Sequence, residues 1–158
     1  MEQETYTVAQ LMDRFEQVCR TKGLRVTHQR IEIYKALVNN TNHPTIEDIF
    51  SHVRTSLKTI SLDTVYRTIN TFEEYGLLKR VHHIDNVTRF DVNITNHHHL
   101  VCSKCNKIED FQWPDFDKMT PPKEISRWGD INVKHVVIDG LCSTCREKNK
   151  TKNNNQIK

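Results

Sequence analysis

Hydrophobic residues recur at helical spacing through the first half of the chain. Four stretches place apolar residues three and four positions apart, and a hydroxyl residue that can cap a helix precedes each one: Thr7, Thr27, Thr45 and Ser61. The residues of the fourth stripe that are predicted to face inward are Leu62, Val65, Ile69 and Phe72. Cys19 lies on the first stripe, so it is interpreted as a small core residue rather than a reactive thiol.

Two strand-like runs follow the fourth helix. They span Leu77–Ile84 and Val87–Val92, with a turn predicted at Asp85-Asn86. Short helices followed by a hairpin are the pattern of a winged helix-turn-helix.

The second half of the chain has a different pattern. Three further strands are predicted at His97–Val101, Lys107–Phe111 and Val133–Ile138, with a short helix at Pro122–Trp128. The chain from Lys148 is polar and rich in Asn, which favours disorder. The predicted fold class is α+β, a winged helix followed by a small α/β domain with three strands. The predicted boundaries are a winged-helix domain at residues 1–90, the second domain at 91–147 and a disordered basic tail at 148–158.

Charge and composition say more about the cellular compartment of the protein than about its function. The 158 residues carry a net charge of +3, and the tail from Arg146 to Lys158 holds five basic residues and one acidic residue. The rest of the chain is therefore slightly acidic, so DNA binding must depend on locally placed charge. Because no stretch resembles a signal peptide or a membrane span, a cytoplasmic protein without a membrane partner is expected.

The five cysteines include two Cys-x-x-Cys pairs, Cys102/Cys105 and Cys142/Cys145. Four thiolates from two such pairs complete a closed tetrahedron around Zn²⁺, which indicates a structural zinc site. The alternative is a thiol redox pair. That alternative needs only one Cys-x-x-Cys in a βαβ context, and the surrounding sequence does not predict that context.

A second cluster lies directly before the first pair of cysteines. His97 and His99 share one face of a strand, whereas His98 faces the other way. Asp91 lies upstream, and Asp110 lies on the next predicted strand. Nitrogen and carboxylate ligands together suit Fe²⁺ or Mn²⁺. The alternative is a run of solvated surface histidines.

Polar and basic residues of the first half form a candidate DNA-binding surface. The predicted fourth helix offers a ring, a guanidinium and small polar groups for bases and phosphates, on Ser61, Thr64, Tyr66, Arg67 and Asn70. The hairpin adds basic side chains that can follow the phosphate backbone, on Lys79, Arg80 and Arg89. The start of the second helix adds Arg25, His28 and Arg30. The alternative for each basic residue alone is an ordinary solvated face.

Taken together, these motifs resemble the ferric uptake regulator family. The resemblance covers roughly Leu24 to Cys145. It includes Arg25-Val26-Thr27-His28-Gln29-Arg30, His43-Pro44-Thr45, Ser61-Leu62-Asp63-Thr64-Val65-Tyr66-Arg67, Arg89-Phe90-Asp91, His97-His98-His99 and both cysteine pairs. The order and spacing of these motifs make the resemblance specific.

The resemblance implies a homodimeric repressor that binds a double-stranded inverted-repeat operator, with structural Zn²⁺ and a regulatory Fe²⁺ or Mn²⁺. It also implies that residues 1–90 are the winged-helix DNA-binding domain and that residues 91–147 are a metal-binding α/β dimerisation domain. Its implied regulatory ligands are His43, Asp91, His97, His99 and Asp110. The DNA-contacting residues expected from the helices and the motifs together are Arg25, Thr27, Arg30, Ser61, Thr64, Tyr66 and Arg67.

Aspartate at both carboxylate positions is similar to the peroxide-sensing branch of the family, since iron sensors commonly have Glu there. In that branch, iron-catalysed oxidation modifies histidine ligands, and His43 and His97 match those positions. The chain departs from the family at Pro121-Pro122, which interrupt a longer helix, and at His135, which is one residue nearer to Cys142. The alternatives are an iron- or zinc-responsive repressor of the same family and, from another class, a metalloenzyme that uses the His/Asp site. The peroxide interpretation involves no substrate turnover, and therefore no enzyme.

Overall fold

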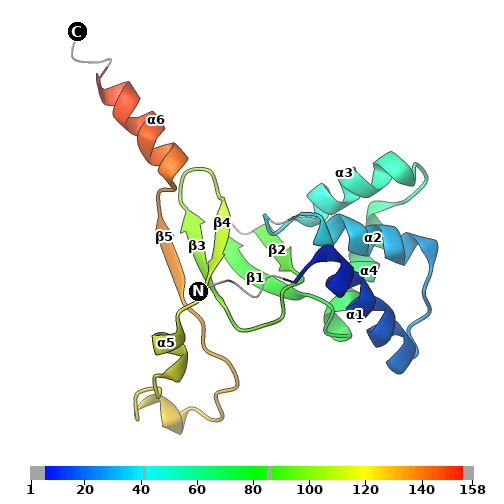
Figure 1. Ribbon diagram of the computed structural model, residues 1–158, viewed down its shortest axis with the longest axis horizontal. Coiled ribbons are helices and arrows are strands. Elements are labelled where there is room, and N and C mark those ends of the chain that lie inside the picture. Colours follow the sequence, from blue (N-terminus) through cyan, green and yellow to red (C-terminus); the bar gives the residue numbers. More distant parts are fainter. Residues whose placement is uncertain (1–5, 41, 85–86, 155–158) are drawn as a thin grey trace. The chain divides into compact units, whose positions relative to one another are not determined.

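Side-chain caps begin each of the first four helices in the computed structural model, which describes residues 6–40, 42–84 and 87–154. The four helices are α1 (Val8–Thr21), α2 (His28–Val38), α3 (Ile46–Ser56) and α4 (Leu62–Glu74) (Figure 1). In each, the hydroxyl of the capping residue accepts a hydrogen bond from the backbone N–H three residues on. The four predicted caps are confirmed: Thr7, Thr27, Thr45 and Ser61.

The helical core centres on three aromatic rings from α1, α2 and α4. Phe15 stacks on Tyr34 with ring centroids 4.7 Å apart, and both rings meet the edge or face of Phe72 at 5.6 Å. Cys19 is buried in the same core, and burial raises the pKa of its thiol. Leu62, predicted to face inward, is instead 44% exposed, because it lies in the first turn of α4 at the edge of the apolar stripe.

An antiparallel hairpin follows α4, as predicted. It is formed by β1 (Lys79–Ile84) and β2 (Val87–Asp91), and it pairs Lys79 with Asp91 and Val81 with Arg89. The predicted turn at residues 85–86 lies outside the described residues. The order of four helices and a hairpin is that of a winged helix.

The second half forms a three-stranded sheet in the order β4-β3-β5. Its strands are β3 (His98–Cys102), β4 (Ile108–Phe111) and β5 (Val137–Gly140). β3 pairs antiparallel with β4 and parallel with β5, so β5 lies at one edge of this sheet. The predicted α+β fold class is confirmed.

The helices of the second half differ from the prediction. α5 (Pro114–Lys118) begins with a proline and acidic residues in its first turn, whereas the predicted helix at Pro122–Trp128 is reduced to a 3-10 turn at Ile125–Arg127. The segment between the prolines and Gly129 is too short for a stable helix.

The C-terminal segment also differs, because α6 (Ser143–Asn154) continues well past Lys148. The prediction of disorder from residue 148 was therefore wrong for residues 148–154. The segment contains no proline or glycine, and its lysines are good helix formers. Residues 155–158 lie outside the described residues.

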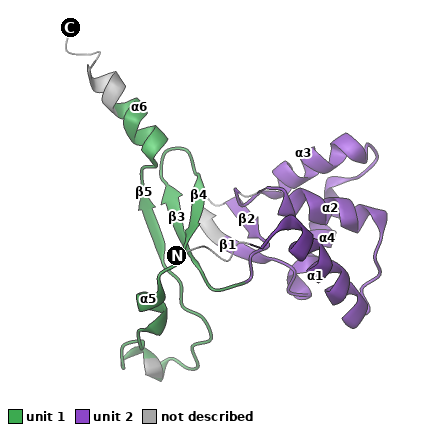
Figure 2. Ribbon diagram, in the orientation of Figure 1, with its two compact units in different colours: residues 1, 95–158 green, residues 2–94 purple. Residues whose placement is uncertain are grey.

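Contacts along the chain separate residues 2–94 from residues 95–158 (Figure 2). We call these the helical unit and the sheet unit, and each is described by itself. Neither unit, over the residues described, has a helix long and apolar enough to cross a membrane.

Candidate metal centres

The four paired cysteines gather at one end of the sheet. Cys102 ends β3 opposite Gly140 of β5, and Cys142 and Cys145 lie at the start of α6. The four sulfur atoms lie within 4.8 Å of one another, and those of Cys105 and Cys142 are 3.7 Å apart. Sulfur atoms bound tetrahedrally to one Zn²⁺ at ~2.3 Å are separated by about 3.8 Å. The arrangement therefore fits a closed four-thiolate zinc site.

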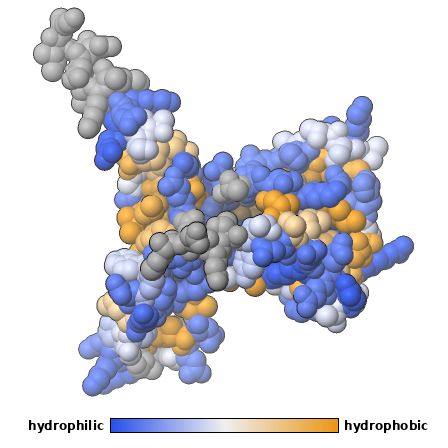
Figure 3. Space-filling view, in the orientation of Figure 1, coloured by the Kyte–Doolittle hydropathy of each residue, from blue (hydrophilic) through white to orange (hydrophobic). Residues whose placement is uncertain are grey.

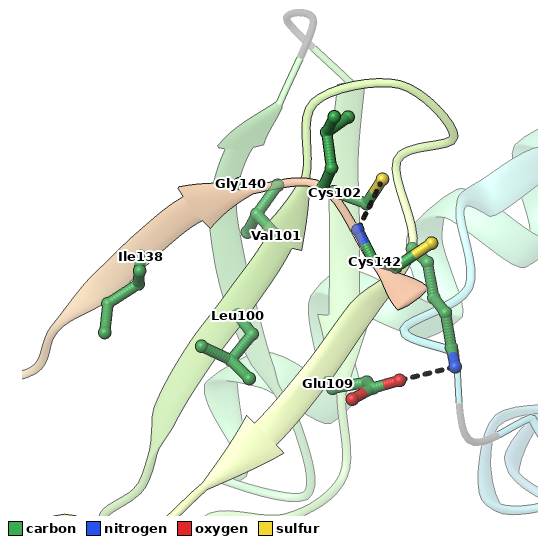
Figure 4. A pocket seen from close by; sticks show the side chains of 9 residues that line it. Leu100, Val101, Cys102, Glu109, Ile138, Gly140 and Cys142 are labelled. Carbon is green, nitrogen blue, oxygen red and sulfur yellow. Dashed lines mark hydrogen bonds and ion pairs between the residues drawn. The ribbon is translucent and has the colours of Figure 1, made fainter. Parts of the chain in front are cut away.

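Hydrogen bonds from backbone amides favour the thiolate form of one of these cysteines, which is the form that binds a metal. The N–H of Cys142 donates to Sγ of Cys102 at 3.4 Å (Figure 4). This bond, with others from the amides of Cys105 and Lys104, lowers the pKa of Cys102 to about 6. Burial raises the pKa of Cys145 to about 12, so that thiol ionises near neutral pH only with a cation beside it.

Two histidines and one aspartate form a second group within the sheet unit. His99 lies directly opposite Asp110 in the pairing of β3 with β4, so their side chains share a face. The Nε2 atoms of His97 and His99 are 3.1 Å apart, and each lies 3.6 Å from a carboxylate oxygen of Asp110. The Nδ1 atom of His97 donates to the carbonyl of Thr95 at 2.8 Å, which turns Nε2 toward this group.

Donor atoms that each lie ~2.1 Å from a metal are separated by about 3.0–3.4 Å. The two histidine nitrogens are at this separation, and the Asp110 oxygens lie slightly beyond it. Both histidines are buried, whereas the Asp110 side chain is 31% exposed. The group supplies three donors, which is fewer than Fe²⁺ or Mn²⁺ ordinarily takes.

His98 lies on the opposite face of β3, as predicted. Its ring packs between Phe111 and Phe116, each with its centroid 5.3 Å away. Its Nδ1 accepts a hydrogen bond from the N–H of Val136 at 3.2 Å, and its Nε2 lies 3.5 Å from Asp117. This side chain joins β3 to the segments beside it and does not share the face of its two neighbours.

A third group lies in the helical unit. The Nε2 atom of His43 lies 3.8 Å from Oδ2 of Asp91, and both side chains are buried. The same Oδ2 lies 3.6 Å from Nζ of Lys79, while Oδ1 accepts a hydrogen bond from the N–H of Asn93 at 2.7 Å. The guanidinium of Arg89 donates to the carbonyl of His43 at 3.1 Å.

The five residues expected to hold the regulatory metal therefore divide into two groups. The helical unit brings His43 to Asp91, and the sheet unit brings His97 and His99 to Asp110. The motifs did not reveal that Lys79 and Arg89 would lie beside the first group. Alternation along β2 places residues 89 and 91 on one face, but the loop they meet lies far away in the sequence.

The predicted recognition helix is α4, and its first turn is exposed. The Tyr66 side chain is 48% exposed, and Arg67 forms an ion pair with Asp63 at 3.0 Å while remaining largely in solvent. The hydroxyls of Ser61 and Thr64 lie 2.8 Å apart, and that of Ser61 also caps the helix. Ser61, Tyr66 and Arg67 are the exposed members of this set, and the hydroxyl of Ser61 already caps the helix.

The start of α2 carries the other predicted DNA contacts. Thr27 caps the helix, and the guanidinium of Arg30 donates to the carbonyl of Arg25 at 2.6 Å. This bond holds the basic loop before α2 to the first turn of the helix.

Basic residues of the hairpin contact protein groups. Arg80 forms two hydrogen bonds to the carboxylate of Glu73 at 2.8 and 2.9 Å, and a third to Asn70 at 2.9 Å. With Lys79 at Asp91 and Arg89 at the His43 carbonyl, all three basic residues predicted to follow the DNA backbone have partners within the helical unit.

Comparison with known proteins agrees with the family resemblance of the sequence motifs. The family model described as "Ferric uptake regulator family" matches residues 21–139. The peroxide-responsive repressor PerR of Staphylococcus epidermidis is 33% identical over 129 residues, which are 82% of this chain and 86% of that protein.

Two solved structures extend the comparison. The ferric uptake regulator of Francisella tularensis with iron is 29% identical, covers 78% of this chain and 96% of its own, and has a TM-score of 0.67. The ferric uptake regulator of Helicobacter pylori has a TM-score of 0.71 at 20% identity, with 92% of this chain and 97% of its own covered, and supports the fold alone.

Proposed function

Because the chain belongs to the ferric uptake regulator family of metal-responsive repressors, we propose that it is a repressor that hydrogen peroxide inactivates. In this proposal the protein binds an inverted-repeat operator as a homodimer when its regulatory metal is bound. Peroxide then modifies a histidine ligand, the site is lost and the operator is released. The observation that carries the peroxide sensitivity is aspartate at both carboxylate positions, Asp91 and Asp110, beside the histidines.

The two sets of donor atoms suit two different metals. Cys102, Cys105, Cys142 and Cys145 would hold a structural Zn²⁺. His43, Asp91, His97, His99 and Asp110 would together hold Fe²⁺ or Mn²⁺, because three imidazoles and two carboxylates form a nitrogen and oxygen set. Because these residues would supply five donors, a bound ion would still be open to a small oxidant.

The residues around the regulatory site have separate roles in the proposed mechanism. A ferrous ion held by these residues would supply the electron that begins cleavage of the peroxide O–O bond, which Mn²⁺ would not. The imidazoles of His43 and His97 are the groups that would take up one oxygen atom of the peroxide, and the other oxygen would leave as water. Burial keeps both rings away from bulk solvent, and the Thr95 carbonyl orients that of His97. An oxidised ring would no longer bind the metal through its nitrogen, so the ion would be released from both groups of ligands.

Operator binding is assigned to α4 and the start of α2. Tyr66 and Arg67 present an aromatic ring and a guanidinium in the first turns of α4, the part of a recognition helix that reads bases in the major groove. Arg25, Thr27 and Arg30 offer basic and amide groups to phosphate at the start of α2, and Ser61 with Thr64 does so at α4.

The sheet supports the proposed homodimer. Hydrophobic surface gathers over β5 in Figure 3, where Val137, Ile138 and Leu141 are each more than 40% exposed. In Figure 4, Ile138 and Leu100 flank a hollow beside the cysteines. An edge strand with exposed apolar side chains is commonly covered by a partner. The free thiols that the zinc site requires are typical of the cytoplasm, where we place the protein.

Mass spectrometry of the peroxide-treated protein tests the mechanism. Protein loaded with Fe²⁺ without oxygen should gain one oxygen atom on the peptide of His43 or His97 and lose operator binding in parallel. Protein loaded with Mn²⁺ should show neither change. His98, which is buried but faces away, serves as an internal control that stays unmodified.

The other outcomes separate the alternatives. If the histidines stay unmodified and operator binding follows the concentration of Fe²⁺ or Zn²⁺, the protein is an iron- or zinc-responsive repressor of the same family. If operator binding does not depend on a metal at all, the proposed role of the His/Asp residues is wrong.

A further inference from the structure

Strand β2 and the loop before α3 are joined at three consecutive residues. The guanidinium of Arg89 donates to the carbonyl of His43 at 3.1 Å, and the N–H of Phe90 donates to the carbonyl of Pro44 at 3.0 Å. The carboxylate of Asp91 then lies 3.8 Å from the His43 ring. Because alternate residues of a strand share a face, Arg89 and Asp91 both reach toward this loop, while Phe90 points into the core.

The backbone of His43 is in a conformation that needs support. Its φ is +51°, in the left-handed region that non-glycine residues rarely adopt. The proline that follows restricts the residue before it still further. Such conformations persist where the surrounding structure holds them in place. The two hydrogen bonds from β2 hold the carbonyls on both sides of the His43–Pro44 junction.

The environment of Arg89 does not resemble that of a phosphate-binding side chain. Arg89 is half-buried, and its Nε atom is buried and makes no hydrogen bond within the part of the chain that the structure describes. In contrast, the Arg67 side chain on α4 is 79% exposed. The position of Arg89 in the hairpin suggested contact with DNA, yet its guanidinium is directed at the loop that carries His43.

We propose that Arg89 is a positioning residue for the regulatory metal site. Its guanidinium holds the His43 peptide in the left-handed conformation, and this turns the imidazole toward Asp91. The inference rests on the proposed function, since it takes His43 and Asp91 as metal ligands. Groups that orient ligands without touching the metal commonly change metal affinity by about 10–100-fold when they are removed.

Arg80 provides a matched control on the other strand of the hairpin. It is also an arginine with protein hydrogen bonds, but these go to Glu73 and Asn70 of α4, and its guanidinium also lies 6.0 Å from the centre of the Phe90 ring. Loss of the Arg80 side chain removes the same charge from the hairpin without removing a hydrogen bond to the His43 loop.

The test uses full-length, zinc-containing protein with the substitutions Arg89→Met, Arg89→Lys and Arg80→Met. Titration calorimetry with Mn²⁺ gives the affinity of the regulatory site. Arg89→Met should weaken Mn²⁺ binding about tenfold. Arg89→Lys should recover most of the loss, because an ammonium can donate to the same carbonyl, and Arg80→Met should change the affinity less than about twofold. If Arg89→Met does not fold, Arg89→Gln, which is too short to reach the carbonyl, replaces it with the same expected loss.

Operator binding at saturating Mn²⁺ separates this role from a phosphate contact. With Arg89 as a positioning residue, the slope of log affinity against log salt should be the same in Arg89→Met and the wild type. A slope reduced by about one, with Mn²⁺ affinity unchanged, would mean that Arg89 contacts phosphate and would overturn the proposal. Unchanged Mn²⁺ affinity and unchanged slope would overturn it as well. The proposed function fails separately, if Asp91→Asn binds Mn²⁺ as tightly as the wild type does.

Discussion

The four-cysteine site should decide whether the sheet unit is folded. Over the described residues of this unit, the buried apolar side chains other than cysteine are Val101 and Ile108. The helical unit has a core cluster of eighteen residues. Burying one valine and one isoleucine contributes about 3–6 kcal/mol, whereas a structural zinc contributes about 10–16 kcal/mol. Zinc bound at this site would therefore stabilise the sheet more than the burial of these two apolar side chains does.

Cys145→Ser is the perturbation that tests this comparison. Cys145 is buried in α6, and its loss leaves three thiols for an ion that needs four ligands. Hydrogen exchange read by mass spectrometry should show amides of β3, β4 and β5 exchanging much faster than in the wild type. Amides of α1, α2 and α4 should keep their protection, because their core does not include the metal.

Cys19→Ser supplies the control, since it makes the same chemical change in the helical core. This variant should keep one zinc per chain by elemental analysis and keep the protection of the sheet. A Cys145→Ser protein that contains no zinc but retains wild-type protection in β3 and β4 would refute the reasoning.

Four further substitutions test the other sites. Asp110→Glu should abolish or strongly reduce peroxide-dependent oxidation of the Fe²⁺ form by mass spectrometry, and unchanged sensitivity would remove the argument from carboxylate identity. Lys79→Met should tighten Mn²⁺ binding about fivefold by calorimetry, because the Lys79 ammonium lies 3.6 Å from Asp91 and repels a divalent ion bound there. The Lys79 side chain is partly exposed, so an unchanged affinity would show that solvent screens its charge. Tyr66→Ala and Arg67→Ala should each weaken specific operator binding by ~1–3 kcal/mol in a gel-shift assay, and wild-type affinity in both would rule out α4 as the recognition helix.

The helices of the first half were predictable because their signals are local. A hydroxyl cap and an apolar stripe lie within one stretch of sequence, as at Thr45 and in the residues that follow it. The cysteine pairs and the antiparallel pairing of β3 with β4 were predictable for a similar reason, since a short metal-binding turn joins the two strands.

The features that were not predicted from the sequence mostly depend on contacts between residues that are distant in the sequence. Nothing near Arg89 indicates that its guanidinium will bind a carbonyl 46 residues earlier in the chain. Likewise, β5 forms only from Val137, later than predicted, because its extent is set by parallel pairing with β3. The α5 helix was missed although Pro114 and the acids after it are a helix-start signal.

Strand β3 ends at Cys102, one of the proposed zinc ligands, and also carries His99, with Leu100 and Val101 between them. Its register against β4 places His99 opposite Asp110. Moving that register by one residue would turn His99 to the other face of the sheet and bring His98 to Asp110. Zinc bound at the four-cysteine site would prevent this slip by fixing the end of the strand. If the proposed sites are correct, a cell short of zinc would make a protein that has all five regulatory ligands in its sequence but does not respond to the second metal. The supply of zinc would then limit how much of the protein can respond.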